Sequence, residues 1–103
     1  MSRNFIGAAY LVVGATAVGL EDATPALING TINGRMARGV IISNNGSEVL
    51  WRGDGNVPQV GYGHPLGTKE TLTMTSDNWR GVVKQLQFIQ VSAAGTLFIE
   101  YTD

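Results

Sequence analysis

The chain has 103 residues and a mass of 10.9 kDa, which is the size of a single domain. Leu, Ile, Val and Phe account for 28 residues, enough for a hydrophobic core, whereas charged residues make up only 15% and the net charge is −1. This balance excludes the uniform positive field of non-specific nucleic-acid binding, and the absence of Cys excludes disulfides and thiolate metal sites.

The N-terminal stretch is uncharged from residue 5 to residue 20. It is shorter than the roughly 20 residues that a membrane-spanning helix needs, and it fits a secretory signal only loosely. We therefore predict an extended N-terminal arm over residues 1–14 and a single β-sandwich domain over residues 15–103. The arm would be anchored on a neighbouring subunit by Phe5, Ile6, Tyr10 and Leu11. The domain would begin with a strand that places Thr16, Val18 and Leu20 on one face.

Turn residues dominate the next segment. Residues 21–38 contain Pro25 and two Asn-Gly pairs, at residues 29–30 and 33–34, which is typical of an excursion between strands. The apolar runs 39–43 and 48–52 then flank Asn44-Asn45-Gly46-Ser47. Because Asn-Gly supplies the positive φ angles of tight turns, these two runs are predicted to form a hairpin.

A glycine-rich segment follows, from residue 53 to residue 69. It is longer than most structureless connections, so we expect packing or a partner to order it. Residues 70–75 then alternate strictly, which predicts a strand with Leu72 and Met74 inward and threonines outward. A turn is expected at residues 76–81.

The C-terminal part is expected to form a second hairpin. Residues 82–91 and 96–101 are joined by Ser92-Ala93-Ala94-Gly95, and the inward set of the last strand is Leu97, Ile99 and Tyr101. No window has convincing helical spacing. Six or seven short strands with regular turn signals indicate an all-β fold, an antiparallel β-sandwich that is jelly-roll-like.

Catalytic and metal-binding chemistry find little support in the residues. His64 is the only histidine, and no serine lies in a nucleophile-elbow sequence. Acidic residues are scattered, without metal-ligand spacing, although paired carboxylates among Glu48, Glu70 and Glu100 stay open. We predict a protein that is not an enzyme, with no catalytic residue, cofactor or metal. The Arg-Gly-Asp sequence at residues 52–54 is interpreted as a strand end entering a turn.

Aromatic residues are the better candidates for contacts. Trp51 alternates with Val49 and is predicted to fill the core, whereas Trp79 lies in a predicted loop, where a large apolar side chain favours a subunit contact. The contact candidates are Phe5, Ile6, Tyr10, Leu11, Tyr62, His64, Trp79 and Arg80.

Several segments between Arg38 and Tyr101 resemble the small all-β virion proteins encoded among the head genes of tailed bacteriophages. The similarity lies in residues 40–52, 54–58, 63–66, 70–73, 86–89 and 96–101. It implies a capsid decoration or cement protein, located on the virion surface, that binds between major capsid subunits and often forms a homotrimer. No catalytic residues, nucleic acid or membrane are implied. A module associated with a phage tail or spike, or a carbohydrate-binding module, is the alternative.

Overall fold

The computed structural model describes residues 4–59, 61–75 and 82–103, and almost all of its regular structure is β-strand. In chain order the elements are β1 (Phe5–Val13), β2 (Val18–Gly19), the 3₁₀ turn η1 (Leu20–Asp22), β3 (Thr31–Ile32), β4 (Arg35–Met36), β5 (Gly39–Asn44), β6 (Val49–Arg52), β7 (His64–Leu66), β8 (Thr71–Thr75), the single-turn helix α1 (Val82–Gln85), β9 (Gln87–Gln90) and β10 (Gly95–Thr102).

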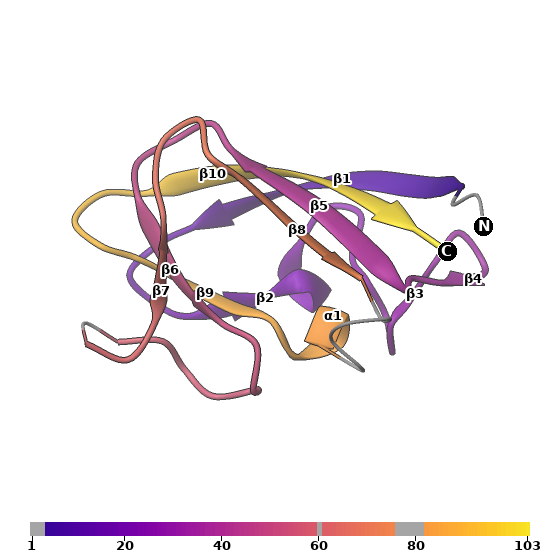
Figure 1. Cartoon of the computed structure of the whole chain (residues 1–103), viewed down its shortest axis with the longest axis horizontal. Coiled ribbons are helices and arrows are strands. Elements are labelled where there is room, and N and C mark those ends of the chain that lie inside the picture. Colours follow the sequence, from indigo (N-terminus) through magenta and orange to yellow (C-terminus); the bar gives the residue numbers. More distant parts are fainter. Residues whose placement is uncertain (1–3, 60, 76–81) are drawn as a thin grey trace.

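Two four-stranded antiparallel sheets lie face to face (Figure 1). The first, the β1 sheet, has the strand order β1-β10-β5-β8, and the second, the β6 sheet, has the order β2-β9-β6-β7. A small hairpin of β3 and β4 stands beside them. The expected antiparallel sandwich is confirmed.

The pairing of the strands is nested. β1 pairs with β10, β2 with β9, β5 with β8 and β6 with β7, so the two halves of the chain run against each other as one long antiparallel ribbon. The additional pairs β5–β10 and β6–β9 close the rolled ribbon into two sheets. This connectivity is that of a jelly roll, as expected.

The core lies between the sheets and follows the alternation of the strands. Leu97, Ile99 and Tyr101 are fully buried, which confirms the predicted inward set of the last strand. Met74 is buried and Leu72 is half-buried, as predicted, and Trp51 is half-buried against the core. The opposite sheet contributes buried side chains from β6, β7 and β9: Val49, Leu66 and Phe88.

The N-terminal segment differs from the expected arm. Residues 5–13 form β1, which pairs with β10 along its length, and Ala9, Leu11 and Val13 point into the core. Inward and outward residues alternate along residues 8–13 as they do in a strand, but the partner strand, β10, lies at the other end of the chain. Of the strand expected over residues 16–20, only Val18–Gly19 forms, and Leu20 begins the 3₁₀ turn.

The first predicted hairpin is wrong in its pairing, although both strands form. β5 and β6 belong to opposite sheets, so residues 45–48 carry the chain from one sheet to the other. Gly46 does not adopt a positive φ; a Cβ atom there would lie 2.5 Å from the backbone nitrogen of Thr96. Glycine is therefore required for close approach to β10, and not for a tight hairpin turn.

The second predicted hairpin fails in the same way. β9 and β10 also lie in opposite sheets, and residues 91–94 cross between them. The expected strand over residues 82–91 begins instead with α1, and only residues 87–90 are extended. The predicted turn at residues 76–81 lies outside the described residues.

A buried amide holds the first crossover. Asn44 is fully buried, and its Nδ2 donates to the carbonyl oxygens of Ser47 at 2.9 Å and Leu66 at 3.0 Å. Its Oδ1 accepts from the Gly46 N–H at 2.9 Å. One side chain thus joins the end of β5, the crossover and β7. Residues 53–69, expected as a long loop, therefore include a strand held by packing.

Both Asn-Gly pairs between residues 21 and 38 are tight turns, as the sequence predicts. Asn29, Gly30, Asn33 and Gly34 all have positive φ, the conformation of type I′ turns. The segment before them returns to the sandwich edge, because Thr24 exchanges two backbone hydrogen bonds with Tyr10 of β1.

Candidate interaction surface

The outer face of the β1 sheet carries exposed apolar side chains, which we call the aromatic face. Its members are Phe5, Tyr10 and Val12 of β1 and Phe98 of β10, which expose 62%, 55%, 57% and 43% of their surface. A register shift between Phe5 and Gly7 brings Phe5 opposite Thr102, on the same side as Tyr10 and Val12. Without this bulge, Phe5 would point to the core side.

The aromatic face continues across the sheet in rows. Tyr10 lies opposite Phe98, which in turn lies opposite Ser43, and Ser43 lies opposite Thr71. The Ser43 and Thr71 hydroxyl oxygens are 3.3 Å apart and share a hydrogen bond. The sheet therefore changes from aromatic on β1 and β10 to hydroxyl-bearing on β5 and β8.

The neighbouring row holds one charge. Ala8, Glu100, Ile41 and Thr73 lie side by side across the same face, and the half-buried Glu100 is its one ionisable side chain. This face thus carries few charges, which suits contact with another protein or a sugar ring better than contact with a polyanion.

The predicted contact residues of the N-terminal segment differ in where their side chains lie. Phe5 and Tyr10 lie on the aromatic face, but Leu11 exposes only 3% of its surface and is part of the core. The structure thus places Leu11 in the core of its own domain, because a strand buries every second residue whereas an arm buries none. Ile6 is half-buried at the bulge, and its carbonyl oxygen accepts from Asn33 Nδ2 at 2.8 Å.

Val12 and Phe98 were not among the predicted contact residues. Phe98 could have been found, because it lies between the inward Leu97 and Ile99 and alternation places it outward. Val12 could not, because its orientation depends on β1 being a strand.

His64 and Tyr62 lie on the opposite sheet and its loop. The imidazole of His64 packs against Trp51, with ring centroids 4.6 Å apart and planes tilted by 35°. Tyr62 is 69% exposed in a turn closed by backbone hydrogen bonds with Gln59. Neither residue belongs to the aromatic face. Trp79 and Arg80 lie outside the described residues.

The Arg-Gly-Asp turn is paired within itself. Arg52 donates from Nε to Asp54 Oδ1 at 3.1 Å and from Nη2 to Asp54 Oδ2. These hydrogen bonds from Arg52, with a further one from the Asn56 N–H, lower the pKa of Asp54 to about 2. Both charges of the tripeptide are therefore satisfied by each other at the end of β6.

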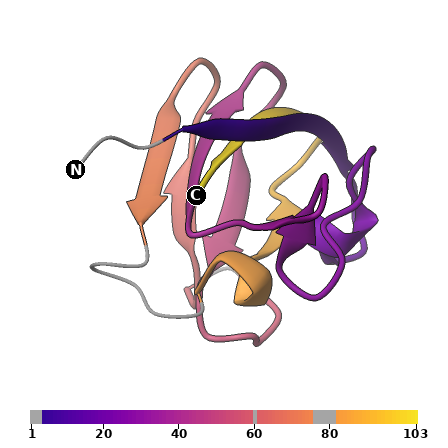
Figure 2. The same cartoon turned by 90° about the vertical axis from the view of Figure 1, so that its right-hand side faces the viewer.

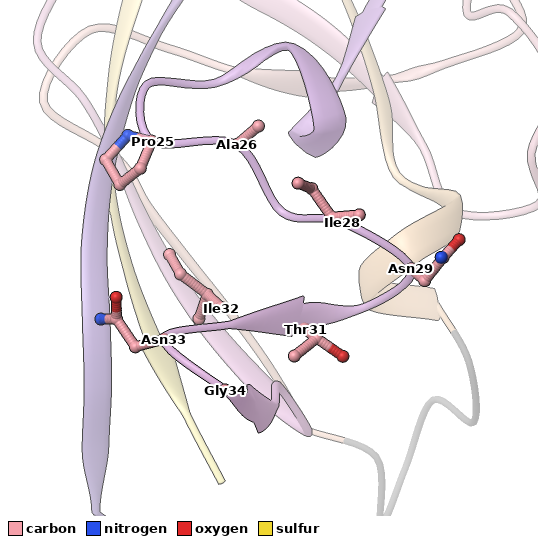
Figure 3. Close-up of a pocket in the computed structure, with 8 residues that line it drawn as sticks. All are labelled: Pro25, Ala26, Ile28, Asn29, Thr31, Ile32, Asn33 and Gly34. Atoms are coloured by element: carbon pink, nitrogen blue, oxygen red, sulfur yellow. The ribbon is translucent and has the colours of Figure 1, made fainter.

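A hollow of about 480 Å³ opens beside the β3–β4 hairpin (Figure 3). Residues 25–28 form one wall, and the two Asn-Gly turns form the other. The lining contains no ionisable side chain: Pro25, Ala26, Ile28, Asn29, Thr31, Ile32, Asn33 and Gly34. It therefore offers apolar surface and amide groups, but no acid, base or nucleophile beyond one threonine hydroxyl.

One buried polar atom stands apart from these surfaces. The Tyr101 hydroxyl has no hydrogen-bond partner among the described residues, and its side chain lies in the core. Burial disfavours the phenolate and raises the pKa of Tyr101 to about 12.

The described residues bring together no group of three or more His, Asp or Glu side chains that could hold a metal ion. They also form no helix with the length and apolar character needed to cross a membrane. Comparisons with protein-family models, curated proteins and solved structures give no match for this chain.

Proposed function

We propose that this protein is a structural component of a bacteriophage virion that decorates the capsid and stabilises it by binding between major capsid subunits. The observation that carries the proposal is the aromatic face. Four apolar side chains, each more than 40% exposed, lie on the outer face of the two paired strands β1 and β10. Gathered apolar side chains of this kind mark contact sites for other molecules.

The energetics suit such a role. Burying a Phe or Val side chain contributes roughly 1.5–3 kcal/mol, so covering this face supplies a useful part of a binding free energy. A protein that binds the assembled shell better than free subunits stabilises the shell by mass action, and a shell offers many identical sites. No reaction chemistry is needed.

The low charge of the chain also supports the proposed capsid-binding function. With 15% charged residues and a net charge of −1, the surface neither repels copies of itself nor attracts polyanions. We take the class of partner, the major capsid protein, and the location, the capsid surface, from the resemblance of residues 38–101 to small phage virion proteins. It also favours a homo-oligomer, with a trimer as the family's frequent form.

A carbohydrate-binding or tail-associated module is the second candidate, and one observation favours it. Tyr10 and Phe98 form a neighbouring aromatic pair, and Ser43 and Thr71 continue the same row with hydroxyl groups. Aromatic faces and hydroxyls together suit a sugar ring. Binding on a glycan array that is abolished by Phe98→Ala would favour this candidate over the capsid.

The location of the protein in a phage particle tests the proposal. Heads and tails of a phage that encodes this chain are separated and analysed by mass spectrometry. Many copies in the head fraction, in a fixed ratio to the major capsid protein, is the expected result. Enrichment in the tail fraction would support the second candidate, and absence from both fractions would refute a virion role.

A further inference from the structure

The edges of the two sheets are protected to different degrees. An unpaired sheet edge is a template for another strand, and proteins protect such edges by keeping them short, adding Pro, or covering them. β2 has only two residues, and β7 has three, including Pro65. The edge of β1 is covered. Thr24 exchanges two backbone hydrogen bonds of 2.9 and 3.0 Å with Tyr10, and the Asn33 side chain donates a hydrogen bond to the carbonyl oxygen of Ile6.

The outer edge of β8 lacks these protections among the described residues. β8 has five residues, Thr71 to Thr75, with no proline and no charge, and it ends the strand order of its sheet. In the end-on view of Figure 2, β8 lies at the margin of the sheet. It is therefore an uncharged edge strand, longer than β2 and β7, of the kind that accepts a partner.

The backbone groups that face outward follow from the register. The Asn44 N–H donates to the Glu70 carbonyl oxygen at 3.0 Å, so Glu70 faces β5. In an antiparallel ladder the backbone groups of successive residues point alternately to one neighbouring strand and to the other. The N–H and C=O groups of Leu72 and Met74 therefore also point to β5. Thr71, Thr73 and Thr75 therefore direct their N–H and C=O groups to the open edge.

The sequence of β8 is complementary to itself. Read in either direction, Thr-Leu-Thr-Met-Thr alternates threonine with a large apolar residue. We propose that β8 pairs antiparallel with β8 of a second copy, about a twofold axis through Thr73. Thr73 then lies opposite its own counterpart, Thr71 opposite Thr75, and Leu72 opposite Met74, so like chemistry meets on both faces.

This pairing satisfies the outward N–H and C=O groups of all three threonines and joins two β1 sheets into one continuous sheet. Because the axis is perpendicular to that sheet, both aromatic faces point to the same side, on strands far from the junction. The contact is isologous and closes at two copies, so it does not form the trimer that the resemblance favours. The inference does not depend on the proposed function.

Sedimentation equilibrium of wild-type, Thr73→Lys and Thr96→Lys proteins tests the pairing. Thr73 and Thr96 are both exposed on the same sheet, but Thr96 lies on β10, away from the β8 edge. Wild type and Thr96→Lys should sediment at twice 10.9 kDa. In Thr73→Lys two like charges meet at the axis, so the dimer dissociation constant should rise about fivefold.

Amide hydrogen exchange provides a second readout that needs no variant. The Thr73 N–H should exchange slowly in concentrated wild-type protein and quickly on dilution, whereas the Met74 N–H, which faces β5, stays protected throughout. A wild-type monomer up to about 1 mM, a trimer, or a dimer that Thr73→Lys leaves intact would overturn the proposal. So would a dimer in which the Thr73 amide is unprotected.

Discussion

Tyr10 and Phe98 lie directly opposite each other on β1 and β10, both on the outer face of the sheet and both exposed. The residues on either side of Phe98 are fully buried. The same two strands therefore close the core on one face and present apolar surface on the other.

Gly46→Ala should destabilise the fold by about 1–3 kcal/mol, because its Cβ would lie 2.5 Å from a backbone nitrogen that cannot move without β10. Gly14→Ala is the matched control, since a Cβ there meets nothing within 4 Å and its change should stay within about 0.5 kcal/mol. Urea unfolding measures both. Equal stabilities would show that the crossover does not need glycine.

Asn44→Ala should cost about 2–3 kcal/mol, because it leaves the buried Leu66 carbonyl group and the part-buried Ser47 carbonyl and Gly46 N–H groups without their partner. Asn45→Ala, in the same crossover but exposed, should change stability little. Thermal unfolding compares the two variants. A small effect at Asn44 would mean that water replaces the amide.

Tyr101→Phe should leave stability at pH 7 unchanged or raise it by up to about 1 kcal/mol, because it removes a buried hydroxyl that has no partner among the described residues. An increase in pH acts differently on the two proteins. The unfolded tyrosine loses its proton near pH 10 and the folded one near pH 12, so wild type should lose stability across this range.

The difference between wild type and Tyr101→Phe isolates that contribution, since every other titrating group is shared. Urea unfolding from pH 9 to pH 12 should show wild type losing roughly 2–3 kcal/mol more than the variant by the upper end of the range. Parallel pH profiles would show that the Tyr101 phenol is not desolvated.

Arg52→Met should return the pKa of the Asp54 carboxyl from about 2 toward 3.8, because it removes the guanidinium that favours the charged form. Carbon-detected NMR titration reports the carboxyl directly. Little change in global stability is expected, since the pair is solvent-screened at the surface. An unshifted Asp54 in wild type would show that the turn is open in solution and that its Arg-Gly-Asp groups are available.

Local alternation was enough to predict the strands and much of the core. Leu97, Ile99 and Tyr101 point inward as expected, because the orientation of a side chain in a strand depends only on its neighbours. Strand partners could not be predicted in this way. Asn44-Asn45-Gly46-Ser47 has the composition of a hairpin turn, yet in a jelly roll consecutive strands belong to opposite sheets.

Only part of the aromatic face could be predicted from the sequence, because strand partners do not follow from local alternation. The sequence pattern predicts Phe5 and Tyr10 as apolar residues of an arm, but the strand that fixes their orientation is β10, about ninety residues away. The bulge that turns Phe5 outward also depends on that pairing. Long-range partners decide which apolar residues are buried and which remain for binding.

Binding to phage heads tests the proposed function most directly. Heads purified from a phage that lacks this protein are mixed with wild type, with the double variant Tyr10→Ser/Phe98→Ser, or with the control Ile28→Ser/Val57→Ser, which removes two exposed apolar side chains elsewhere. Copies bound per head are counted by mass spectrometry over a concentration series, and circular dichroism verifies that each variant is folded.

The aromatic-face variant should bind about a hundredfold more weakly, the loss expected for two buried side chains, and the control should bind like wild type. Equal binding by the aromatic-face variant and wild type, or no binding of wild type to heads, would contradict the proposal that this face holds the protein on a capsid.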